Sequence, residues 1–251
     1  PLNREIKVVM NSEYKLAALD QSIIVEPEKA ADSAVIWLHG LGADGHDFVG
    51  ILPQLNLPEN HSIRFIFPHA PVQPVTVNGG MTMRSWYDIY SMSIAEKMDL
   101  RSIRLSSGVL KELIEQQLAQ GIAAEKIVIA GFSQGGLVAL NTALSSDYPL
   151  AGVIALSTYY PLACLDVLAE PNSSINTFMV HGTDDPIIPL SVAETSYHRL
   201  QDLGCTVECH TKPLGPILIK EEGEDMSVGG LGGGGLVRSG SGGGGGCLWC
   251  R

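Results

Sequence analysis

The pentapeptide Gly131-Phe-Ser133-Gln-Gly135 has the spacing of a serine nucleophile on a sharp turn between a strand and a helix. Glycine is needed on both sides of such a serine because the strand and the helix approach closely there. The apolar run Ile127–Ala130 precedes the turn and a helical pattern follows it, which is the context that the motif requires. We therefore expect Ser133 to attack an acyl carbonyl; the alternative is a serine that only caps the helix.

Attack on a carbonyl creates an oxyanion, which needs hydrogen-bond donors that are already in place. We expect the first donor to be the backbone N–H of Gln134, where the helix N-terminus also favours negative charge. The second donor should come from the loop in Trp37-Leu-His-Gly-Leu-Gly42, which follows the apolar run Ala34–Leu38. We assign it to the N–H of Leu41 and expect His39 to support the loop rather than to react.

A carboxylate that could orient a catalytic base follows another apolar run, Thr177–Val180. It lies in the segment His181-Gly-Thr-Asp-Asp185, at a strand's carboxyl end, where α/β sheets place their sites. Either Asp184 or Asp185 could serve, and the residue pattern alone does not choose between them. The other aspartate fits a turn or a helix cap.

Short apolar runs alternate with longer helical patterns along the chain, which predicts the α/β class: a mostly parallel central sheet flanked by helices on both faces. Most runs are dense in Val, Ile and Phe, as in strands buried on both sides. The predicted strands are Ser22–Val25, Ala34–Leu38, Arg64–Phe67, Ile127–Ala130, Gly152–Leu156, Thr177–Val180 and Thr206–Cys209. The predicted helices are Arg101–Gln120, Gln134 to about Ser145, and Ser191–Leu203.

Composition excludes several classes of protein. A chain of 251 residues that is 45% hydrophobic can form one domain with a large core, and a net charge of −11 argues against nucleic-acid binding. Five unevenly spaced cysteines are not typical of a disulfide framework, and the terminal pair Cys247 and Cys250 fits chance better than a metal or redox site. We recognise no signal peptide and no apolar run long enough to cross a bilayer, so we expect a cytoplasmic location.

Four segments of the chain are distinctive: VIWLHGLGADGHDF, FIFPHAPVQPVTVNGGMTMRSWYD, IVIAGFSQGG and MVHGTDDPIIP. Together, from about residue 20 to Gly215, they resemble the phospholipase/carboxylesterase family, which includes the acyl-protein thioesterases. The resemblance implies an α/β-hydrolase fold and hydrolysis of carboxylic esters or acyl thioesters through an acyl-serine intermediate, with no cofactor and no metal. It also places Asp185 at the position of the family's acid, and the family's oxyanion donors fall on Leu41 and Gln134.

The resemblance adds a candidate substrate-binding residue. The segment Met83–Asp88 matches a family segment near the acyl-binding groove, so we expect Trp86 to contact the substrate. The alternative is that Trp86 belongs to an aromatic pair in the core. Asp88 fits a turn aspartate better than a functional one.

The resemblance stops where the family has its catalytic histidine, after the last strand in a segment similar to YPMGH. The segment Cys209–Gly215 follows this pattern, but Pro216 stands at the position of the histidine. His198 is expected on the outer face of a helix, and His210 occurs about six residues too early, roughly 20 Å along an extended chain. We therefore expect neither histidine to replace the missing base.

The family also has an amphipathic C-terminal helix, which has no counterpart here. We expect residues 1–216 to form a hydrolase domain without its final helix, and 217–251 to form a glycine-rich, disordered tail. Loss of the helix should expose an apolar strip of the sheet. The abrupt change suggests a frameshift, an altered splice or a gene-model error. Finding no histidine codon and no amphipathic helix in any reading frame after codon 215 would remove that idea.

A serine hydroxyl is a weak nucleophile until a base takes its proton, so we expect an impaired serine esterase or thioesterase. Its substrate would be a small-molecule ester or an acylated protein, and the loop Pro71–Gly80 could pair two subunits into a homodimer. The alternative from another class is a non-catalytic protein that binds acyl chains or lipids. Labelling of Ser133 by a fluorophosphonate distinguishes the two.

Overall fold

The computed structural model of the chain describes residues 8–10, 14–19, 22–91, 98–161, 163–164, 172, 174–213 and 215. Pro216, the predicted domain boundary and the predicted glycine-rich tail lie outside the described residues. Within the part that is described, no helix combines the length and the apolar character that a membrane span requires.

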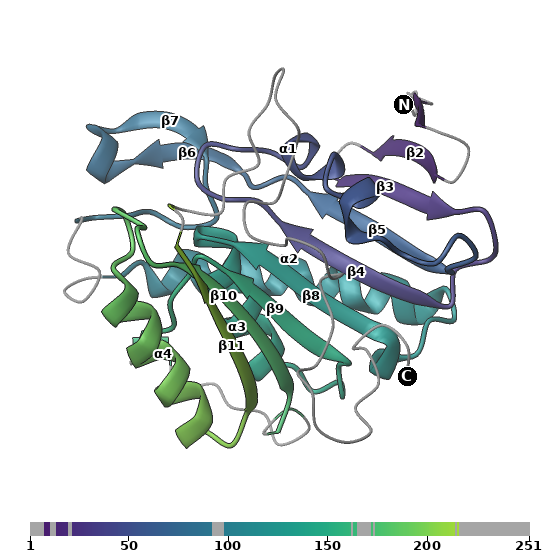
Figure 1. Cartoon of the computed structure of the whole chain (residues 1–251). Coiled ribbons are helices and arrows are strands. Elements are labelled where there is room, and N and C mark those ends of the chain that lie inside the picture. The colour runs from purple at the N-terminus through teal and green to yellow at the C-terminus, as the bar shows by residue number, and fades with distance from the viewer. Residues whose placement is uncertain are drawn as a thin grey trace.

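Among the described residues, nine strands form one sheet in the order β1-β2-β3-β5-β4-β8-β9-β10-β11 (Figure 1). The pairs β1–β2, β2–β3 and β3–β5 are antiparallel, and every pair from β5 to β11 is parallel. The predicted mostly parallel sheet is therefore confirmed. The strands are β1 (Val8–Met10), β2 (Tyr14–Leu19), β3 (Ser22–Pro27), β4 (Ser33–Leu38), β5 (Ile63–Pro68), β8 (Ile127–Phe132), β9 (Gly152–Leu156), β10 (Asn176–Gly182) and β11 (Thr206–Lys212).

All seven predicted strands are present, and the largest difference in bounds is at β11. This strand continues past Cys209, its predicted end, to Lys212. Its residues are exposed or half-buried along its whole length. A strand at the edge of a sheet lacks the dense apolar pattern of a central strand, so its end could not be recognised in the sequence.

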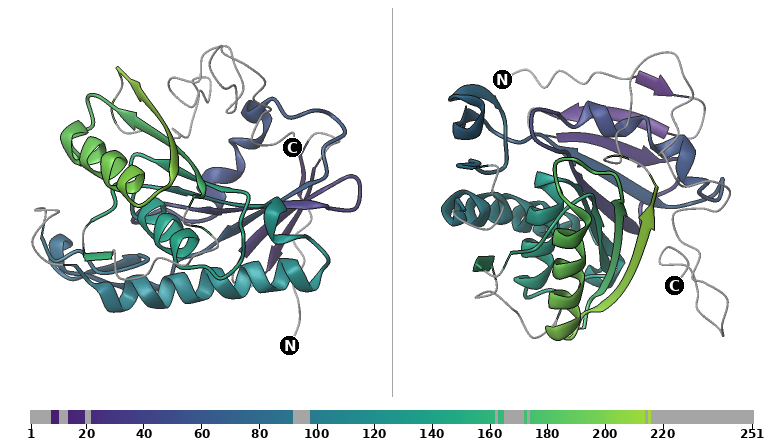
Figure 2. Two further views of the ribbon diagram at one scale, coloured as in Figure 1. Left: turned by 90° about the horizontal axis from the view of Figure 1, so that it is seen from below. Right: turned by 60° about the vertical axis from the view of Figure 1, so that its left-hand side comes forward.

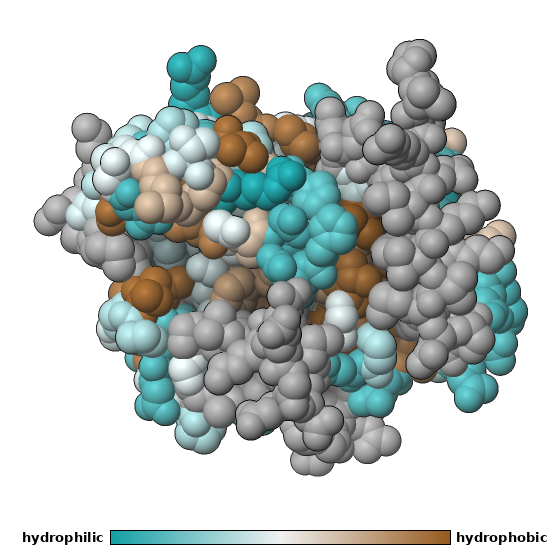
Figure 3. All heavy atoms as spheres, turned by 90° about the horizontal axis from the view of Figure 1, so that it is seen from above, coloured by the Kyte–Doolittle hydropathy of each residue, from teal (hydrophilic) through white to brown (hydrophobic). Residues whose placement is uncertain are grey.

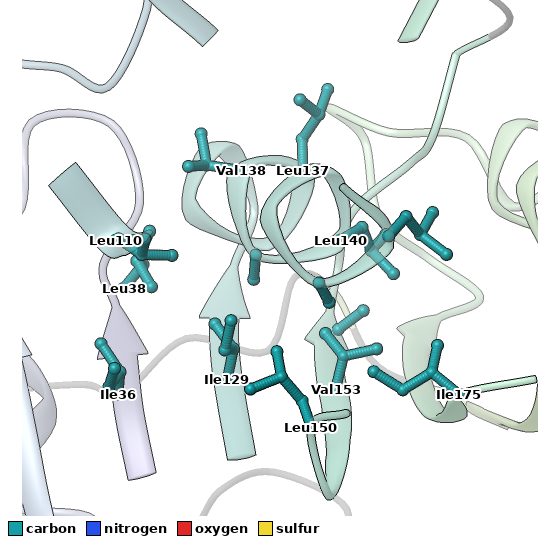
Figure 4. Close-up of a cluster of buried hydrophobic side chains, with 14 of the residues drawn as sticks. Ile36, Leu38, Leu110, Ile129, Leu137, Val138, Leu140, Leu150, Val153 and Ile175 are labelled. Carbon is teal, nitrogen blue, oxygen red and sulfur yellow. The ribbon is translucent and has the colours of Figure 1, made fainter. Parts of the chain in front are cut away.

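The three predicted helices are confirmed as α2 (Leu100–Ala119), α3 (Gln134–Leu144) and α4 (Leu190–Asp202). The helix α2 runs along one side of the sheet (Figure 2, left). Side chains from α2 and α3 pack there against β4, β8 and β9 in a buried cluster that includes Leu110, Leu137, Leu140, Ile36, Ile129 and Val153 (Figure 4). This layer fixes α3, and with it the turn at which Ser133 lies.

The other face of the sheet holds a second core. It is covered by α1 (His46–Val49) and the 3₁₀ turn η1 (Leu52–Leu55), which are the only helical elements on this side among the described residues. Helices on both faces agree with the predicted class. On this face Ile154 and Val180 are buried, whereas Phe132 and Phe178 are half-buried, and the ring of Phe178 lies beside that of His210. The exposed apolar strip that we expected stays a prediction.

A hairpin occupies the segment that we expected to be the loop Pro71–Gly80. It consists of β6 (Val72–Val75), the 3₁₀ turn η2 (Thr76–Asn78) and β7 (Met81–Arg84); a further 3₁₀ turn, η3 (Ala124–Lys126), precedes β8. The exposed side chains of Val72 and Met81 are on this hairpin. Seen from above, apolar side chains reach the surface on the side that holds the hairpin and α4, among hydrophilic ones (Figure 3).

Candidate active site

Ser133 lies at the turn between β8 and α3 with φ 51° and ψ −118°, a conformation that side-chain-bearing residues rarely adopt. Hydrogen bonds to β9 and to the loop after it hold this turn. The N–H of Ser133 donates to the carbonyl of Leu156 at 2.9 Å, and the hydroxyl of Thr158 donates to the carbonyl of Ser133 at 2.7 Å. Backbone strain of this kind persists only where the surrounding structure enforces it, and it is concentrated at functional sites.

Glycines allow the loop after β4 to approach this turn. A β-carbon on Gly135 would lie 2.5 Å from the carbonyl oxygen of His39, and one on Gly40 would lie 2.9 Å from the ring of Phe132. The strands β4 and β8 also end side by side, because Leu38, the last residue of β4, pairs with Gly131 near the end of β8. The segments that carry Leu41 and Ser133 therefore lie against each other, as the predicted oxyanion site requires.

In the part of the chain that is described, the backbone N–H groups of the two predicted oxyanion donors have no hydrogen-bond partner. Leu41 donates to no described residue, and Gln134 is the first residue of α3, where the helix offers its N–H no partner. Leu41 is half-buried. Both donors can thus serve a ligand at the turn, although their role in stabilising an oxyanion remains a prediction.

The side chain of Gln134 forms a hydrogen-bond cluster that the sequence did not reveal. Its Oε1 accepts from the N–H of Trp86 at 2.8 Å, and its Nε2 donates to Oγ of Ser85 at 2.9 Å and to the carbonyl of Tyr87 at 2.6 Å. All three partners lie some fifty residues earlier in the chain. The only signal in the sequence is a glutamine at the start of a helix that is mostly apolar.

Trp86, the predicted substrate-binding residue, is only 1% exposed. Its indole Nε1 donates to the carbonyl of His39 at 2.9 Å, and its own carbonyl accepts from Oγ of Ser106 at 2.5 Å. This burial favours the core alternative over contact with the substrate. Asp88 accepts from the N–H and hydroxyl of Thr76, as expected of a turn residue.

His39 supports the loop after β4 in the way that we expected. Its Nε2 accepts from the N–H of Ala70 at 3.0 Å, and its Nδ1 lies 2.7 Å from the carbonyl of Gly40, to which it donates. Burial lowers the pKa of His39 to about 4. The ring is therefore neutral near pH 7, which is the protonation state that these two bonds require.

Asp185 is buried at the end of β10, whereas Asp184 is exposed. One carboxylate oxygen of Asp185 accepts from the N–H groups of Ile187 and Ile188, at 2.8 and 3.0 Å. The other oxygen lies 3.8 Å from Nε2 of His181. These bonds fix the orientation of the Asp185 carboxylate, whereas the exposed Asp184 accepts a single long hydrogen bond, at 3.5 Å from the hydroxyl of Thr183, among the described residues.

His181 is a residue that the sequence reasoning did not single out. Its Nε2 lies 2.8 Å from the carbonyl of Ile188, to which it donates. Nδ1 is buried and has no hydrogen-bond partner among the described residues. His181 therefore braces the loop that holds Asp185.

Neither of the two later histidines reaches the site. His198 is exposed on α4. His210 lies within β11, paired with Val180, and its Nε2 is 2.7 Å from a carboxylate oxygen of Glu208. In the part of the chain described, neither ring forms a hydrogen bond or ion pair with Ser133 or Asp185.

Three side chains able to ligate a metal gather near the start of α1. Ligand atoms of Asp44, His46 and His69 lie within 4.8 Å of one another. However, Nδ1 of His46 pairs with Asp44 at 3.0 Å, and Nδ1 of His69 accepts from the N–H of Gly45 at 3.1 Å. The second bond leaves the proton of the neutral His69 ring on Nε2, so neither nitrogen is free to ligate. Local hydrogen bonding accounts for this cluster.

A strained serine between a parallel strand and a helix, on a sheet of this topology, defines the α/β-hydrolase class. Residues 19–227 match the family model described as phospholipase/carboxylesterase. The chain therefore belongs to the phospholipase/carboxylesterase family, whose members are hydrolases, and the match extends past Gly215.

Curated relatives agree with this assignment. The chain is 38% identical over 194 residues to acyl-protein thioesterase 1 of Debaryomyces hansenii, covering 74% of this chain and 84% of that protein. It is 41% identical over 181 residues to acyl-protein thioesterase 1 of Schizosaccharomyces pombe, covering 70% and 80%. Its hydrolase class thus follows from relatives as well as from the family model.

Solved structures show the same fold. The crystal structure of Arabidopsis thaliana SOBER1 superposes with a TM-score of 0.68 at 29% identity, covering 73% of this chain and 90% of that one. Acyl-protein thioesterase 2 of Zea mays gives a TM-score of 0.67 at 24% identity, covering 78% and 91%, and supports the fold alone. The predicted α/β-hydrolase fold is confirmed.

Proposed function

We propose that this chain is a serine esterase or thioesterase in which Ser133 is the nucleophile, the N–H groups of Leu41 and Gln134 hold the oxyanion, and Asp185 is the acid. The observation that carries the proposal is the backbone of Ser133, which is held at φ 51° on a turn with the loop after β4 packed against it. A helix-capping serine needs no such conformation. The Ser133 side chain also makes no capping hydrogen bond.

The relatives named acyl-protein thioesterases support an acyl thioester or ester as substrate. Oγ of Ser133 would bond to the acyl carbon while a base takes its proton, and the leaving thiol or alcohol would receive that proton. Water would then attack the acyl-serine and release the acid. Asp185 would hold the protonated base during both steps.

We further propose that the chain lacks this base, because Pro216 occupies the position at which the family has its histidine. Removal of the base in subtilisin lowers kcat by about 10⁶-fold and leaves the contribution of the oxyanion hole and binding. Free imidazole can occupy the space of a missing histidine and accept the proton. The chain should therefore be slow by itself and respond to added imidazole.

The test measures hydrolysis of p-nitrophenyl esters by the full chain with increasing imidazole. We expect the rate above the background of imidazole itself to rise in the chain and to stay at zero in Ser133→Ala. The variant Pro216→His should be faster without imidazole. Equal imidazole-dependent rates in the chain and in Ser133→Ala would refute the role of Ser133.

Two other outcomes are informative. Fluorophosphonate labelling of Ser133 at the rate of an active esterase, without imidazole, would refute the missing base. Binding of a fluorescent fatty acid with no hydrolysis under any condition would refute the enzyme and favour a non-catalytic acyl-binding protein. Hydrolysis rates against acyl-chain length then define the preferred substrate.

A further inference from the structure

We propose that the side-chain amide of Gln134 is a positioning group that sets the spacing of the two oxyanion donors, acting through Trp86 on the loop that carries Leu41. The catalytic part of this proposal, the stabilisation of an oxyanion, rests on the proposed function. The mechanical part, the coupling between Gln134 and the loop that carries Leu41, rests on hydrogen bonds alone. The proposal assigns separate roles to the two ends of Gln134. The backbone N–H would face the ligand, and the side chain would hold the segment Ser85–Tyr87, to which the loop that carries Leu41 is bonded.

The first link joins Gln134 to the segment Ser85–Tyr87. A glutamine amide has two N–H donors and one oxygen acceptor, and here all of them are engaged with this one segment. The hydroxyl of Ser85 also donates to the carbonyl of Tyr87 at 2.6 Å, which fixes it as the acceptor for Nε2. Rotating the amide by 180° would place an NH₂ group against the N–H of Trp86, so only one orientation is allowed.

The second link joins Trp86 to the loop after β4. The indole donates to the carbonyl of His39, and the ring centroids of the two residues are 5.1 Å apart. The same carbonyl lies against Gly135, immediately after Gln134. The contacts from Gln134 to Trp86, from Trp86 to His39 and from His39 to Gly135 therefore form a closed ring at the start of α3. A closed ring of contacts is stiffer than a single contact.

A third contact places Leu41 inside this arrangement. The N–H of Gly42 donates to the carbonyl of Arg84 at 2.9 Å, just before the segment that Gln134 holds. Leu41 thus lies between two ties to one segment, His39 on one side and Gly42 on the other. These two ties restrict the movement of the Leu41 N–H relative to that of Gln134.

Burial makes the links strong. Gln134, Trp86, Ser85 and Tyr87 are each no more than 3% exposed, so water cannot replace a lost bond. The backbone carbonyl of Trp86 also accepts from Ser106 on α2, which would keep the backbone of residue 86 against α2 if the Gln134 amide were removed. Removal should therefore loosen the segment without unfolding it.

Amide hydrogen exchange on the full chain tests the mechanical part without relying on activity. The substitution Gln134→Met keeps the size of the side chain and removes its three bonds. We expect exchange at the N–H groups of Trp86 and Gly42 to become roughly tenfold faster or more. The substitution Trp86→Phe removes the indole donor but leaves the backbone N–H of residue 86 bonded to Gln134, so it should speed exchange at Gly42 and leave the N–H of residue 86 protected.

Asn141→Leu is the matched control. Asn141 is a second buried amide on α3, and its Nδ2 donates to Oγ of Ser107 on α2 at 3.0 Å. Its loss should leave exchange at Trp86 and Gly42 within about twofold of the unsubstituted chain. An unchanged exchange rate at the N–H of Gly42 in Gln134→Met would overturn the proposal. The same acceleration of exchange in Asn141→Leu would also overturn it.

Kinetics in the Pro216→His background test the catalytic part. Gln134→Met should lower kcat at least tenfold with KM nearly constant, because misplaced oxyanion donors act on the transition state rather than on substrate binding. Normal kcat together with faster exchange would refute the link to the oxyanion. No hydrolysis even in the parent Pro216→His would count against the proposed function, while the exchange result would still decide the mechanical link.

Discussion

A β-carbon on Gly131 would lie 2.4 Å from the carbonyl oxygen of Gly135, closer than real side chains approach a backbone oxygen. The two glycines flank Ser133 and allow the end of β8 to turn directly into α3. The contact is between backbone and backbone, so neither partner can rotate away. The strained turn therefore depends on residue 131 having no side chain.

Gly131→Ala should lower the free energy of unfolding by about 3 kcal/mol, because the added carbon overpacks a rigid contact. Gly108→Ala is the control, since Gly108 lies within α2 with no atom near its β-carbon position. It should stabilise the chain by about 0.5–1 kcal/mol. Urea unfolding measures both. A Gly131→Ala chain as stable as the unsubstituted one would contradict the geometry of the turn.

Asp185→Ala should destabilise the chain by about 1–3 kcal/mol, because it leaves the N–H groups of Ile187 and Ile188 without their acceptor. Asp185→Asn keeps an acceptor oxygen and should retain most of this stability. In the Pro216→His background, however, it should lower kcat by roughly 10³–10⁴-fold. Asp184→Asn, at the exposed neighbour, is the control and should change neither the free energy of unfolding nor kcat much. Equal losses of kcat at positions 184 and 185 would argue against Asp185 as the acid.

His39 should make stability depend on pH. An unfolded chain protonates this ring near pH 6.5, whereas the folded chain, with its pKa lowered to about 4 by burial, keeps it neutral. Between these values the unfolded state binds more protons, so stability falls as pH falls. From pH 7 to pH 5 the loss due to His39 should be about 2 kcal/mol. Urea unfolding of His39→Gln should show a pH dependence smaller by this amount; an identical dependence would contradict the lowered pKa.

Thr158 should stabilise the serine turn in two separable ways. Thr158→Val keeps the shape of the side chain but removes the hydrogen bond to the carbonyl of Ser133, at a cost of about 1 kcal/mol. Thr158→Ser keeps the hydroxyl but removes the methyl group that packs beside Gly136. In the Pro216→His background, Thr158→Val should lower kcat more than Thr158→Ser does. The opposite order would show that packing, not the hydrogen bond, holds the turn.

The central elements could be predicted from the sequence because their signals are strong and local. Buried strands such as Ile127–Phe132 are dense in apolar residues, and the glycines around Ser133 mark the turn that follows. The hairpin β6–β7 was missed because its strands are only four residues long and almost entirely exposed or half-buried. The end of β11 was missed because its residues are also exposed or half-buried.

The contacts of the candidate site could be predicted only in part. The motifs predict Ser133 and Gln134 after β8 and Asp185 after β10, because they reflect the backbone path. They cannot show that the Gln134 side chain bonds to Trp86 across 48 residues, since such a contact leaves no periodic pattern in the sequence. The burial of Trp86 likewise depends on packing against α2, which is why the segment match alone could not decide its role.

The parallel pairing of β4 with β8 runs in register from Ala34 opposite Ile127 to Leu38 opposite Gly131. A slip of one residue would shift the loop after β4 by about 3.3 Å along the strand and turn every side chain of β4 to the other layer. The hydrophobic pattern that selects the correct alignment during folding thereby also selects the distance between the two halves of the site. A substitution that weakens this alignment should therefore lower the catalytic rate before it unfolds the chain.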